Sequence, residues 1–382
     1  MVPTAIMKHS GVIQLLRDLV AIPSVSPQGD PGTDRTGEEQ IAKFIAGFLR
    51  RMGADVELQY VEPGRPNVIG KLAARGRARR AVALGPHTDT VSVRGMTIKP
   101  FDPVVRGGRL YGRGASDTKA NLAAFLWAMK RLAESRAASR DNDIYFTGLM
   151  GEESGNDGVK HLMRRGKSKL LGRLDFAIAG EPTELDIVNA HKGALWLRIA
   201  TSGRSCHGAT PERGDNAIYK MSRIVEWLER DYAVRLTRRH PVLGRATINV
   251  GTIRGGSKVN IVPHRCEIEV DHRTLPGDNH VKFLRQLRAK FGPVEIEVLN
   301  DNTGLDTPAS HPIVVQLAAA SGGRCVGAPW FSDGAIFARH GVPAVAFGAG
   351  SIAQAHTRDE FTSVSQVERC AAAMETFLAN LS

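Results

Sequence analysis

Histidine and acidic residues follow several short apolar runs along this 382-residue chain. The runs are AVALGP (81–86), IYFTGLM (144–150), FAIAG (176–180) and VPAVAFG (342–348). The residues that follow them are His87, Asp89, Glu152, Glu153, Glu181 and His356. A further acid, Asp117 in YGRGASDTKANL, immediately precedes an apolar helical pattern. Each residue alone has an ordinary explanation as a turn, cap or solvated loop residue, but their common placement indicates one site.

Two histidines and several carboxylates, without a cysteine, form a ligand set suited to a zinc-like cation. Two such ions ~3.5–4 Å apart would make a co-catalytic site, in which one carboxylate bridges the ions and one position is left for water. The adjacent Glu152 and Glu153 in GEES suggest a division of labour. One glutamate would coordinate a metal, and its neighbour would act as a general base on water.

The elements that must position these residues belong to an α/β domain. Apolar residues at helical spacing predict helices over 37–52 and 119–133, and Thr36 followed by Glu39 predicts a capping box at the first. The runs above, together with 67–73, predict buried strands. Strands that alternate with helices favour a mixed, mostly parallel sheet flanked by helices on both faces. Ligands bind outside the carboxyl ends of strands in such sheets, so the candidates should converge at one edge.

A second pattern occupies the middle of the chain. The strands and helices predicted there follow the order β-α-β-β-α-β, which is the ferredoxin-like arrangement. They cover 194–202, 216–230, 246–254, 265–273, 279–291 and 294–299. The sequence therefore predicts an α/β catalytic domain made of 1–188 and 307–382, with a smaller α+β domain inserted at 189–306.

Composition excludes several other classes of protein. The chain carries a formal net charge of +12, but its basic clusters are scattered and lack interleaved aromatic residues, which is not typical of a nucleic-acid-binding module. No stretch approaches the ~20 apolar residues of a membrane span. The first residues show no secretion signal, and the four cysteines form no C-x-x-C pair. We therefore expect a cytoplasmic protein that binds neither nucleic acid nor membrane.

The motifs also carry a resemblance to a known family. The stretches that carry it are GPHTDTV, GRGASDTK, GEESG, AGEPT, GRSCHGATPERGDNAI, GGSKVNIVP and QAHTRDEF, in this order over nearly the whole chain. The chain resembles the zinc-dependent metallohydrolase family that contains acetylornithine deacetylase, succinyl-diaminopimelate desuccinylase, aminoacylase and the glutamate carboxypeptidases. The resemblance implies a catalytic domain with an inserted lid that forms a homodimer.

The resemblance also implies a role for individual residues. His87, Asp117 and Glu181 would hold one metal, and Asp117, Glu153 and His356 would hold the other, with Asp117 as the bridge. Glu152 matches the general base, and Asp89 matches the acid that orients His87. From the inserted domain, His207 matches the residue that assists the developing oxyanion, and Asn260 and Arg273 match positions that hold the substrate carboxylate. One departure lies beside Asp117, where Ala120-Asn121 replaces the glycine pair common in the family.

The function that follows is hydrolysis of the amide bond of an N-acyl amino acid or short peptide by a dinuclear metal site. Zn²⁺ is the expected metal, and Co²⁺ or Mn²⁺ would be expected to substitute. The stretch GAGSIAQAHTRDEF most resembles acetylornithine deacetylases, so an N-acetylated basic amino acid is the first expected substrate. Desuccinylase, aminoacylase and carboxypeptidase activities are alternatives. A non-catalytic metal protein that binds peptides, and a nucleic-acid binder, are alternatives from other classes.

Overall fold

The computed structural model describes residues 10–135, 140–164 and 166–381, which fold into two compact units. The first unit comprises the described residues of Met1–Asn189, Thr307–Val326 and Ser332–Ser382. The second unit comprises Ala190–Asp306 and Gly327–Phe331. Within the described residues, no helix is both long enough and apolar enough to cross a membrane.

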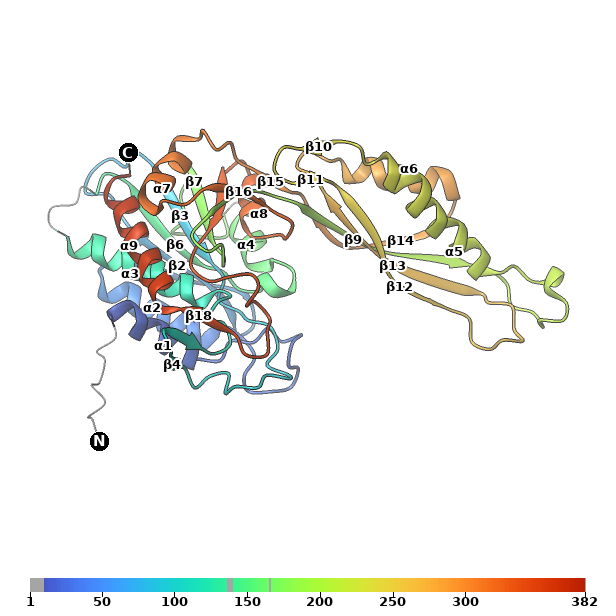
Figure 1. The fold of residues 1–382 in the computed structure, drawn as a ribbon, viewed down its shortest axis with the longest axis horizontal. Coiled ribbons are helices and arrows are strands. Elements are labelled where there is room, and N and C mark those ends of the chain that lie inside the picture. The colour runs from blue at the N-terminus through green and yellow to red at the C-terminus, as the bar shows by residue number, and fades with distance from the viewer. Residues whose placement is uncertain (1–9, 136–139, 165, 382) are drawn as a thin grey trace. The chain divides into compact units, whose positions relative to one another are not determined.

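A mixed sheet forms the centre of the first unit (Figure 1). Its strand order is β1-β2-β6-β3-β7-β17-β8. The bounds are β1 (Asp55–Glu62), β2 (Arg65–Leu72), β3 (Ala81–Pro86), β6 (Asp143–Gly148), β7 (Phe176–Gly180), β8 (Ile187–His191) and β17 (Ala344–Phe347). β3 runs parallel to β6 and β7, and β17 runs parallel to β7. The inner strands are buried along almost their whole length, which explains why their sequences read as continuous apolar runs.

Helices cover both faces of this sheet. One face carries α1 (Gly11–Ala21), α2 (Glu39–Arg51), α3 (Lys119–Glu134), α7 (Pro312–Ser321) and α9 (Val364–Ala379). The other face carries α4 (Asp157–Leu162) and α8 (Gly334–Arg339) (Figure 1). α3 packs against α1 and α9, and its side chains Leu122, Phe125, Leu126 and Met129 are fully buried. The first turn of α3 is therefore fixed by the core, just after Asp117.

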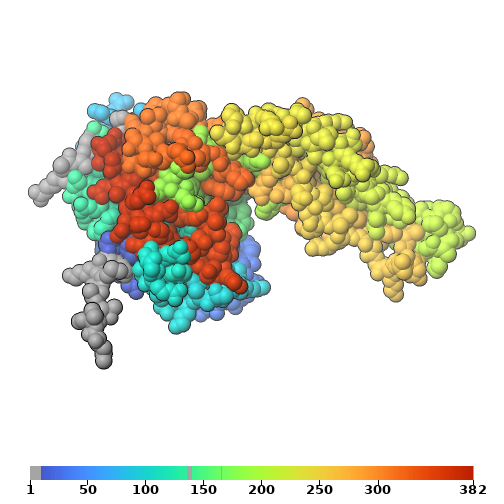
Figure 2. All heavy atoms as spheres, in the orientation of Figure 1, coloured from blue at the N-terminus to red at the C-terminus, as the bar shows by residue number. Residues whose placement is uncertain are grey.

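A smaller sheet joins the segment before Asp117 to the C-terminal part of the chain. It contains β4 (Val104–Arg106), β5 (Arg109–Tyr111) and β18 (Phe361–Ser363), in the order β18-β5-β4. Tyr111 pairs with Phe361 in the antiparallel ladder. The C-terminal segments, red in the space-filling view, form part of the visible surface of the first unit (Figure 2). Short strands β15 (Leu305–Asp306) and β16 (Cys325–Ala328) lie where the chain passes from one unit to the other.

The second unit contains an antiparallel sheet of order β12-β13-β9-β14 with helices on one face. The main elements are β9 (Gly193–Ser202), α5 (Ala217–Glu226), β12 (Thr247–Gly255), β13 (Arg265–Thr274), α6 (His280–Phe291) and β14 (Glu295–Asn302). Buried and part-exposed residues alternate along β13, as in a sheet with one solvated face. A short hairpin of β10 (Arg239–His240) and β11 (Gly244–Arg245) follows the helical segment. The predicted fold class, α/β with a ferredoxin-like α+β insertion, is confirmed.

One local prediction is wrong. α2 begins at Glu39 rather than at a capping box on Thr36, whose hydroxyl donates to the backbone oxygen of Thr33. Gly37 has a φ of 93°, which no helix allows, and Glu39 pairs instead with Lys43.

The helix predicted over 216–230 is present, but it is α-helical only in its first part. α5 ends at Glu226, and a π-helical segment, η3 (Trp227–Tyr232), and a short 3₁₀ turn, η4 (Ala233–Arg235), follow it. The wider turn places the rings of Trp227 and Tyr232 against each other, with centroids 5.3 Å apart.

Candidate metal centre

The residues predicted from the strand ends meet at one edge of the large sheet. Because β3, β6, β7 and β17 are parallel, their carboxyl ends lie together. His87 follows β3 directly, and Glu181 follows β7 directly. Glu152 and Glu153 begin the short 3₁₀ turn η1 (Glu152–Ser154) after β6, and His356 lies in the loop after β17. Asp117 reaches the same edge from the turn before α3.

The carboxylate of Asp117 lies between the two imidazoles. Its Oδ1 is 3.0 Å from Nε2 of His87, and its Oδ2 is 3.5 Å from Nε2 of His356. His356 is also 3.0 Å from Oε1 of Glu153. A carboxylate that presents one oxygen to each of two histidines has the arrangement of a bridging ligand. Among the described residues, potential ligand atoms of His87, Asp117 and Glu153 all lie within 4.8 Å of one another, so this group could hold a metal ion.

Asp89 connects the first histidine to the paired glutamates. Nδ1 of His87 lies 3.0 Å from the main-chain oxygen of Asp89 and 3.4 Å from its carboxylate. The same carboxylate accepts the backbone N–H groups of Glu152 and Glu153, at 3.1 and 3.2 Å. A hydrogen bond to Nδ1 leaves Nε2 of His87 facing Asp117, which is the orientation that a metal-ligating histidine requires.

Glu152 is held by residues that the sequence did not single out. The amide of Asn156 donates to Oε1 of Glu152, at 3.3 Å, and to Oδ1 of Asp333, at 3.0 Å. Asn156 and Asp333 stand at the N-caps of α4 and α8, so in the sequence both look like ordinary helix-capping residues. In the described structure, neither the Asn156 nor the Asp333 side chain makes a capping hydrogen bond to its own helix, and the sequence alone does not reveal this.

The site contains more carboxylates than its two histidines can neutralise. Burial and the nearby charge of Glu181 raise the pKa of Glu152 well above its usual range, and burial also raises the pKa of Glu181. Burial raises the pKa of Asp333 to about 7. Such a surplus of buried negative charge, together with two imidazoles, fits divalent cations, which would lower the cost of ionising these groups.

Nearby carboxylates favour the protonated form of both histidines. Hydrogen bonds to Asp117 and Glu153 raise the pKa of His356 to about 10. Burial opposes the protonation of His87, but its hydrogen bonds to Asp117 and Asp89 raise its pKa well above 6.5. Burial likewise opposes the ionisation of Asp117, yet the hydrogen bonds from His356 and His87 lower its pKa. Because metal ligation needs neutral imidazole, binding of a cation at this group should release protons.

Glu360 fixes the loop that carries Asp117, and the sequence reasoning missed it. The Glu360 side chain is fully buried and accepts four hydrogen bonds. Oε1 accepts the N–H groups of Ser116, at 2.8 Å, and Asp117, at 3.0 Å. Oε2 accepts the N–H of Gly114, at 3.0 Å, and the guanidinium of Arg113, at 2.7 Å. The quoted stretch QAHTRDEF contains Glu360, but no spacing rule links it to a loop some 240 residues earlier.

The departure beside Asp117 has a structural consequence. The side-chain oxygen of Asn121 accepts the N–H of Ala349 at 2.7 Å, and its amide donates to the oxygen of Ala349 at 3.2 Å. Thr118 donates to the oxygen of Gly180 at 2.7 Å. The first turn of α3 is thus tied both to the end of β7 and to the segment that follows β17.

The remaining predicted residues lie in the second unit. His207 is exposed in a loop, where its Nδ1 accepts the N–H of Ala209 at 3.1 Å. Asn260 lies in a neighbouring exposed loop, and its backbone oxygen accepts the N–H of Gly208. Arg273 lies near the end of β13, and its Nε is 3.0 Å from Oδ1 of Asp271. His207 and Asn260 are therefore close together within this unit.

Comparisons with known proteins show the family to which the chain belongs. A family model described as peptidase family M20/M25/M40 matches residues 83–380. The chain belongs to this family. It is thus a hydrolase of the M20 type, and the resemblance inferred from the sequence motifs is confirmed. Acetylornithine deacetylase of Proteus mirabilis (strain HI4320) is 32% identical over 376 residues, which cover 93% of each chain. Acetylornithine deacetylase of Myxococcus xanthus is 31% identical over 378 residues, which cover 96% of each chain.

Solved structures share the M20 fold. Aminopeptidase PepT of Bacillus cereus superposes with a TM-score of 0.78 at 22% identity, covering 96% of this chain and 97% of that one. The metallo-carboxypeptidase Sso-CP2 of Sulfolobus solfataricus gives 0.78 at 19% identity, covering 97% and 99%. The YXEP protein of Bacillus subtilis, described as a dinuclear metal binding peptidase of the M20 family, gives 0.70 at 15% identity, covering 96% of each chain.

Proposed function

We propose that this M20 hydrolase is a dinuclear metal-dependent amidohydrolase that cleaves the amide bond of an N-acyl amino acid, first of all an N-acetylated basic one such as N-acetylornithine. The observation that carries the proposal is the carboxylate of Asp117, which faces His87 with one oxygen and His356 with the other. The deacetylase relatives, alike over more than nine-tenths of the chain, support the choice of substrate.

In this proposal His87, Asp117 and Glu181 hold one ion, and Asp117, Glu153 and His356 hold the other. Zn²⁺ is the proposed metal, with Co²⁺ or Mn²⁺ as substitutes. When bound, the cations would polarise the scissile carbonyl and lower the pKa of water at the site. Asp89 keeps the ring of His87 in position through its contacts with Nδ1.

Glu152 is the proposed general base. It accepts a proton from the attacking water, and it later gives that proton to the nitrogen of the leaving amine, so that acetate and a free amino acid result. Burial raises its pKa, which makes the ionised form a stronger base. Asn156 keeps Oε1 of Glu152 in place through an amide that Asp333 also holds.

Residues of the second unit complete the proposal. His207 would donate to the oxyanion that develops on the acyl carbon, and it would do so in the site of a partner subunit, within a homodimer formed through the inserted domains. Asn260 and Arg273 would hold the carboxylate of the substrate. The proximity of His207 and Asn260 in one loop region supports their action on one ligand. We also propose a cytoplasmic location.

The test is a hydrolysis screen of the purified chain, loaded in turn with Zn²⁺, Co²⁺ and Mn²⁺. The substrates are N-acetylornithine, N-succinyl-diaminopimelate, N-acetylated apolar amino acids, and dipeptides with a C-terminal glutamate. We expect the highest kcat/KM for N-acetylornithine. A clear preference for another substrate of the set would show that the activity is that of a desuccinylase, an aminoacylase or a carboxypeptidase.

Two outcomes would reject the catalytic proposal itself. If no substrate is cleaved by metal-loaded protein, the chain would be a metal protein that binds peptides without hydrolysing them. If Glu152→Gln retained full activity, the assignment of Glu152 as the general base would be wrong. A nucleic-acid function predicts binding to duplex DNA that weakens steeply with salt, whereas the amidohydrolase predicts no such binding.

A further inference from the structure

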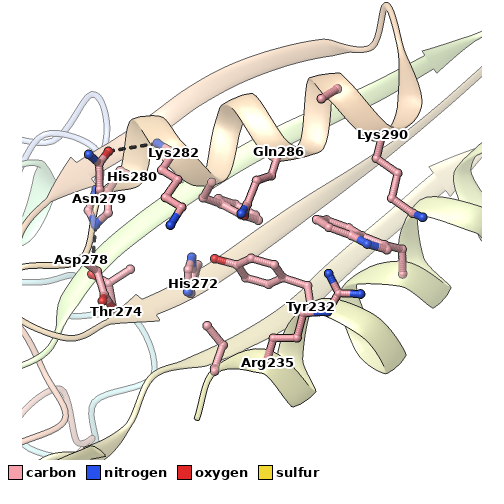
Figure 3. A pocket seen from close by; sticks show the side chains of 14 residues that line it. Tyr232, Arg235, His272, Thr274, Asp278, Asn279, His280, Lys282, Gln286 and Lys290 are labelled. Atoms are coloured by element: carbon pink, nitrogen blue, oxygen red, sulfur yellow. Dashed lines mark hydrogen bonds between the residues drawn. The ribbon is translucent and has the colours of Figure 1, made fainter. Parts of the chain in front are cut away.

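A second cavity lies within the second unit, among residues with no part in the metal centre. It has a volume of about 570 Å³ and is formed by the segment from Trp227 to Leu236, the end of β13, and α6 (Figure 3). This volume is within the ~300–1,000 Å³ range of small-molecule sites. All of its lining residues belong to the same unit.

His272 lies at the floor of this cavity with neither ring nitrogen hydrogen-bonded. The residue is 3% exposed, and among the described residues neither buried nitrogen has a hydrogen-bond partner. The second histidine of the cavity, His280, is different, because its nitrogens contact Thr274 at 3.0 Å and Asp301 at 2.5 Å. Burial and the neighbouring His280 lower the pKa of His272 to about 4, so it is neutral at physiological pH. A neutral imidazole offers one donor and one acceptor, and leaving both unmet in the protein interior is unfavourable.

Aromatic rings surround His272. The centroid of Tyr232 is 5.5 Å from the imidazole, and that of Phe283 is 5.1 Å from it, both at steep angles. Tyr232 and Phe283 are themselves 4.5 Å apart, and Trp227 packs on Tyr232. These rings give the inner part of the cavity walls that suit a flat apolar group.

Cationic side chains surround the entrance. Lys282 and Lys290 extend from α6, and Arg235 enters from the opposite wall (Figure 3). The only carboxylate in the lining of the described structure is that of Asp278, which already pairs with Arg238 at 2.6 Å. The entrance therefore has a positive charge that an anionic group would complement.

We propose that this cavity is a second small-molecule site, and that it binds an organic anion with a flat apolar body. The anionic group would lie beside Lys282 or Lys290, which stand at opposite ends of the cavity (Figure 3). The ring system would lie against Tyr232, and a polar group on the ring would meet His272. This site goes beyond the proposed hydrolysis, since none of its residues takes part in that reaction.

The experiment is calorimetric titration of the full chain with benzoate, indole carboxylate, naphthoate and phenyl phosphate. Each titration is made on metal-loaded protein and again after chelation. We expect at least one of the anions to bind with one site per chain, at sub-millimolar to millimolar affinity, with and without metal. The uncharged amide of the same ring should bind about tenfold more weakly or not at all. Carboxylate and phosphate probes together distinguish which anionic group the lysines prefer.

Variants test the location. His272→Phe should weaken binding of the best probe at least about tenfold, and so should Lys282→Glu combined with Lys290→Glu. Arg285→Glu is the matched control, because Arg285 is exposed on the same helix but does not line the cavity. It should leave binding unchanged.

Three results would overturn the proposal. The first is failure of all four probes to bind, which would mean that the cavity holds only water. The second is binding that disappears on chelation, which would place the probes at the metal centre. The third is binding that survives both His272→Phe and the double charge reversal. If metal-loaded protein hydrolyses none of the substrates but still binds the probes, the proposed function is rejected and this site stands.

Discussion

Replacing Glu360 by glutamine should loosen the loop that carries Asp117. Each carboxylate oxygen of Glu360 accepts two hydrogen bonds. A glutamine amide of the same size has one oxygen that accepts and one NH₂ group that cannot. Whichever way the amide is turned, two buried donors therefore lose their acceptor and face another donor.

The magnitude follows from these contacts. An unsatisfied buried donor costs roughly 1–3 kcal/mol, so two cost about 2–6 kcal/mol. If the NH₂ group faces Arg113, which is 2% exposed, a buried cation also loses its partner. The N–H of Asp117 is among the four donors, so the loss should displace the bridging carboxylate as well as lower stability. Outer residues that orient metal ligands typically contribute about 10–100-fold in metal affinity.

Two measurements check this prediction. Urea unfolding should show a loss of at least about 2 kcal/mol, and competition with a chelator should show Zn²⁺ affinity reduced at least about tenfold. The control is Glu368→Gln, since Glu368 is part-exposed on α9, where it accepts a hydrogen bond from the hydroxyl of Ser10 that a glutamine oxygen can also accept. It should change neither quantity. A Glu360→Gln protein with stability within about 1 kcal/mol of the parent and unchanged metal affinity would refute the reasoning.

Four other perturbations follow from the structure. Glu152→Gln should lower kcat by about 10²–10⁴-fold without lowering metal content, whereas Glu153→Gln should lower metal content. Kinetics and elemental analysis measure the two effects, and mutants with exchanged effects would show that the two roles are reversed. Extensive chelation should abolish hydrolysis and Zn²⁺ should restore it, which full activity in metal-free protein would contradict. His207→Ala should turn over roughly 10²–10³ more slowly, and mixing with Glu152→Gln should recover up to about a quarter of the activity; no recovery, despite subunit exchange shown by mass spectrometry, would exclude action across the dimer. His272→Phe should resist acid better, because the pKa of His272 is lowered to about 4 by burial. Between pH 6.5 and 4 the unfolded chain binds more protons than the folded one, so the free energy of unfolding of the parent falls by up to about 3 kcal/mol, a loss that the variant does not share. Equal acid unfolding curves would contradict this.

The strands that can be predicted from the sequence are those whose burial requires apolar residues. β3, β6, β7 and β17 are buried on both faces, and each appears in the sequence as an uninterrupted apolar run. β1 was missed although it pairs with β2 over most of its length. Its residues are mostly exposed or part-exposed, so the strand appears in DVELQYVE as alternating polar and apolar residues and not as the continuous apolar run by which the buried strands were identified.

A local rule failed where a neighbouring side chain makes a tertiary contact. Thr36 and Glu39 have the spacing of a capping box, but Gly37 adopts a positive φ between them. Glu38 is then drawn inward to accept two hydrogen bonds from Arg65, at 2.7 and 2.8 Å. A buried ion pair to a residue 27 positions away outweighs a cap worth about 1 kcal/mol, and short-range spacing contains no information about it.

The residues of the site likewise include some that the sequence predicts and some that it does not. Parallel strands bring their carboxyl ends together as a matter of topology, so residues placed directly after strands, such as His87 and Glu181, can be assigned to one edge from the sequence. Asp333, Asn156 and Glu360 act through side-chain contacts with partners up to 247 positions away, and each stands where a cap or loop residue is unremarkable. The sequence pattern predicts the residues that the strands place at the site, whereas the residues that fix their orientation depend on tertiary packing.

The balance of charge explains why these supporting residues are needed. Around the two histidines the chain gathers the carboxylates of Asp89, Asp117, Glu152, Glu153, Glu181 and Asp333, most of them almost fully buried. Without a cation their mutual repulsion and burial oppose ionisation, so the protein stores an unfavourable electrostatic arrangement in its folded state. Rigid anchors, such as the four hydrogen bonds to Glu360, keep the ligands from relaxing apart. A divalent cation that enters such a site relieves repulsion without waiting for the ligands to reorganise, and its binding free energy adds directly to the stability of the first unit.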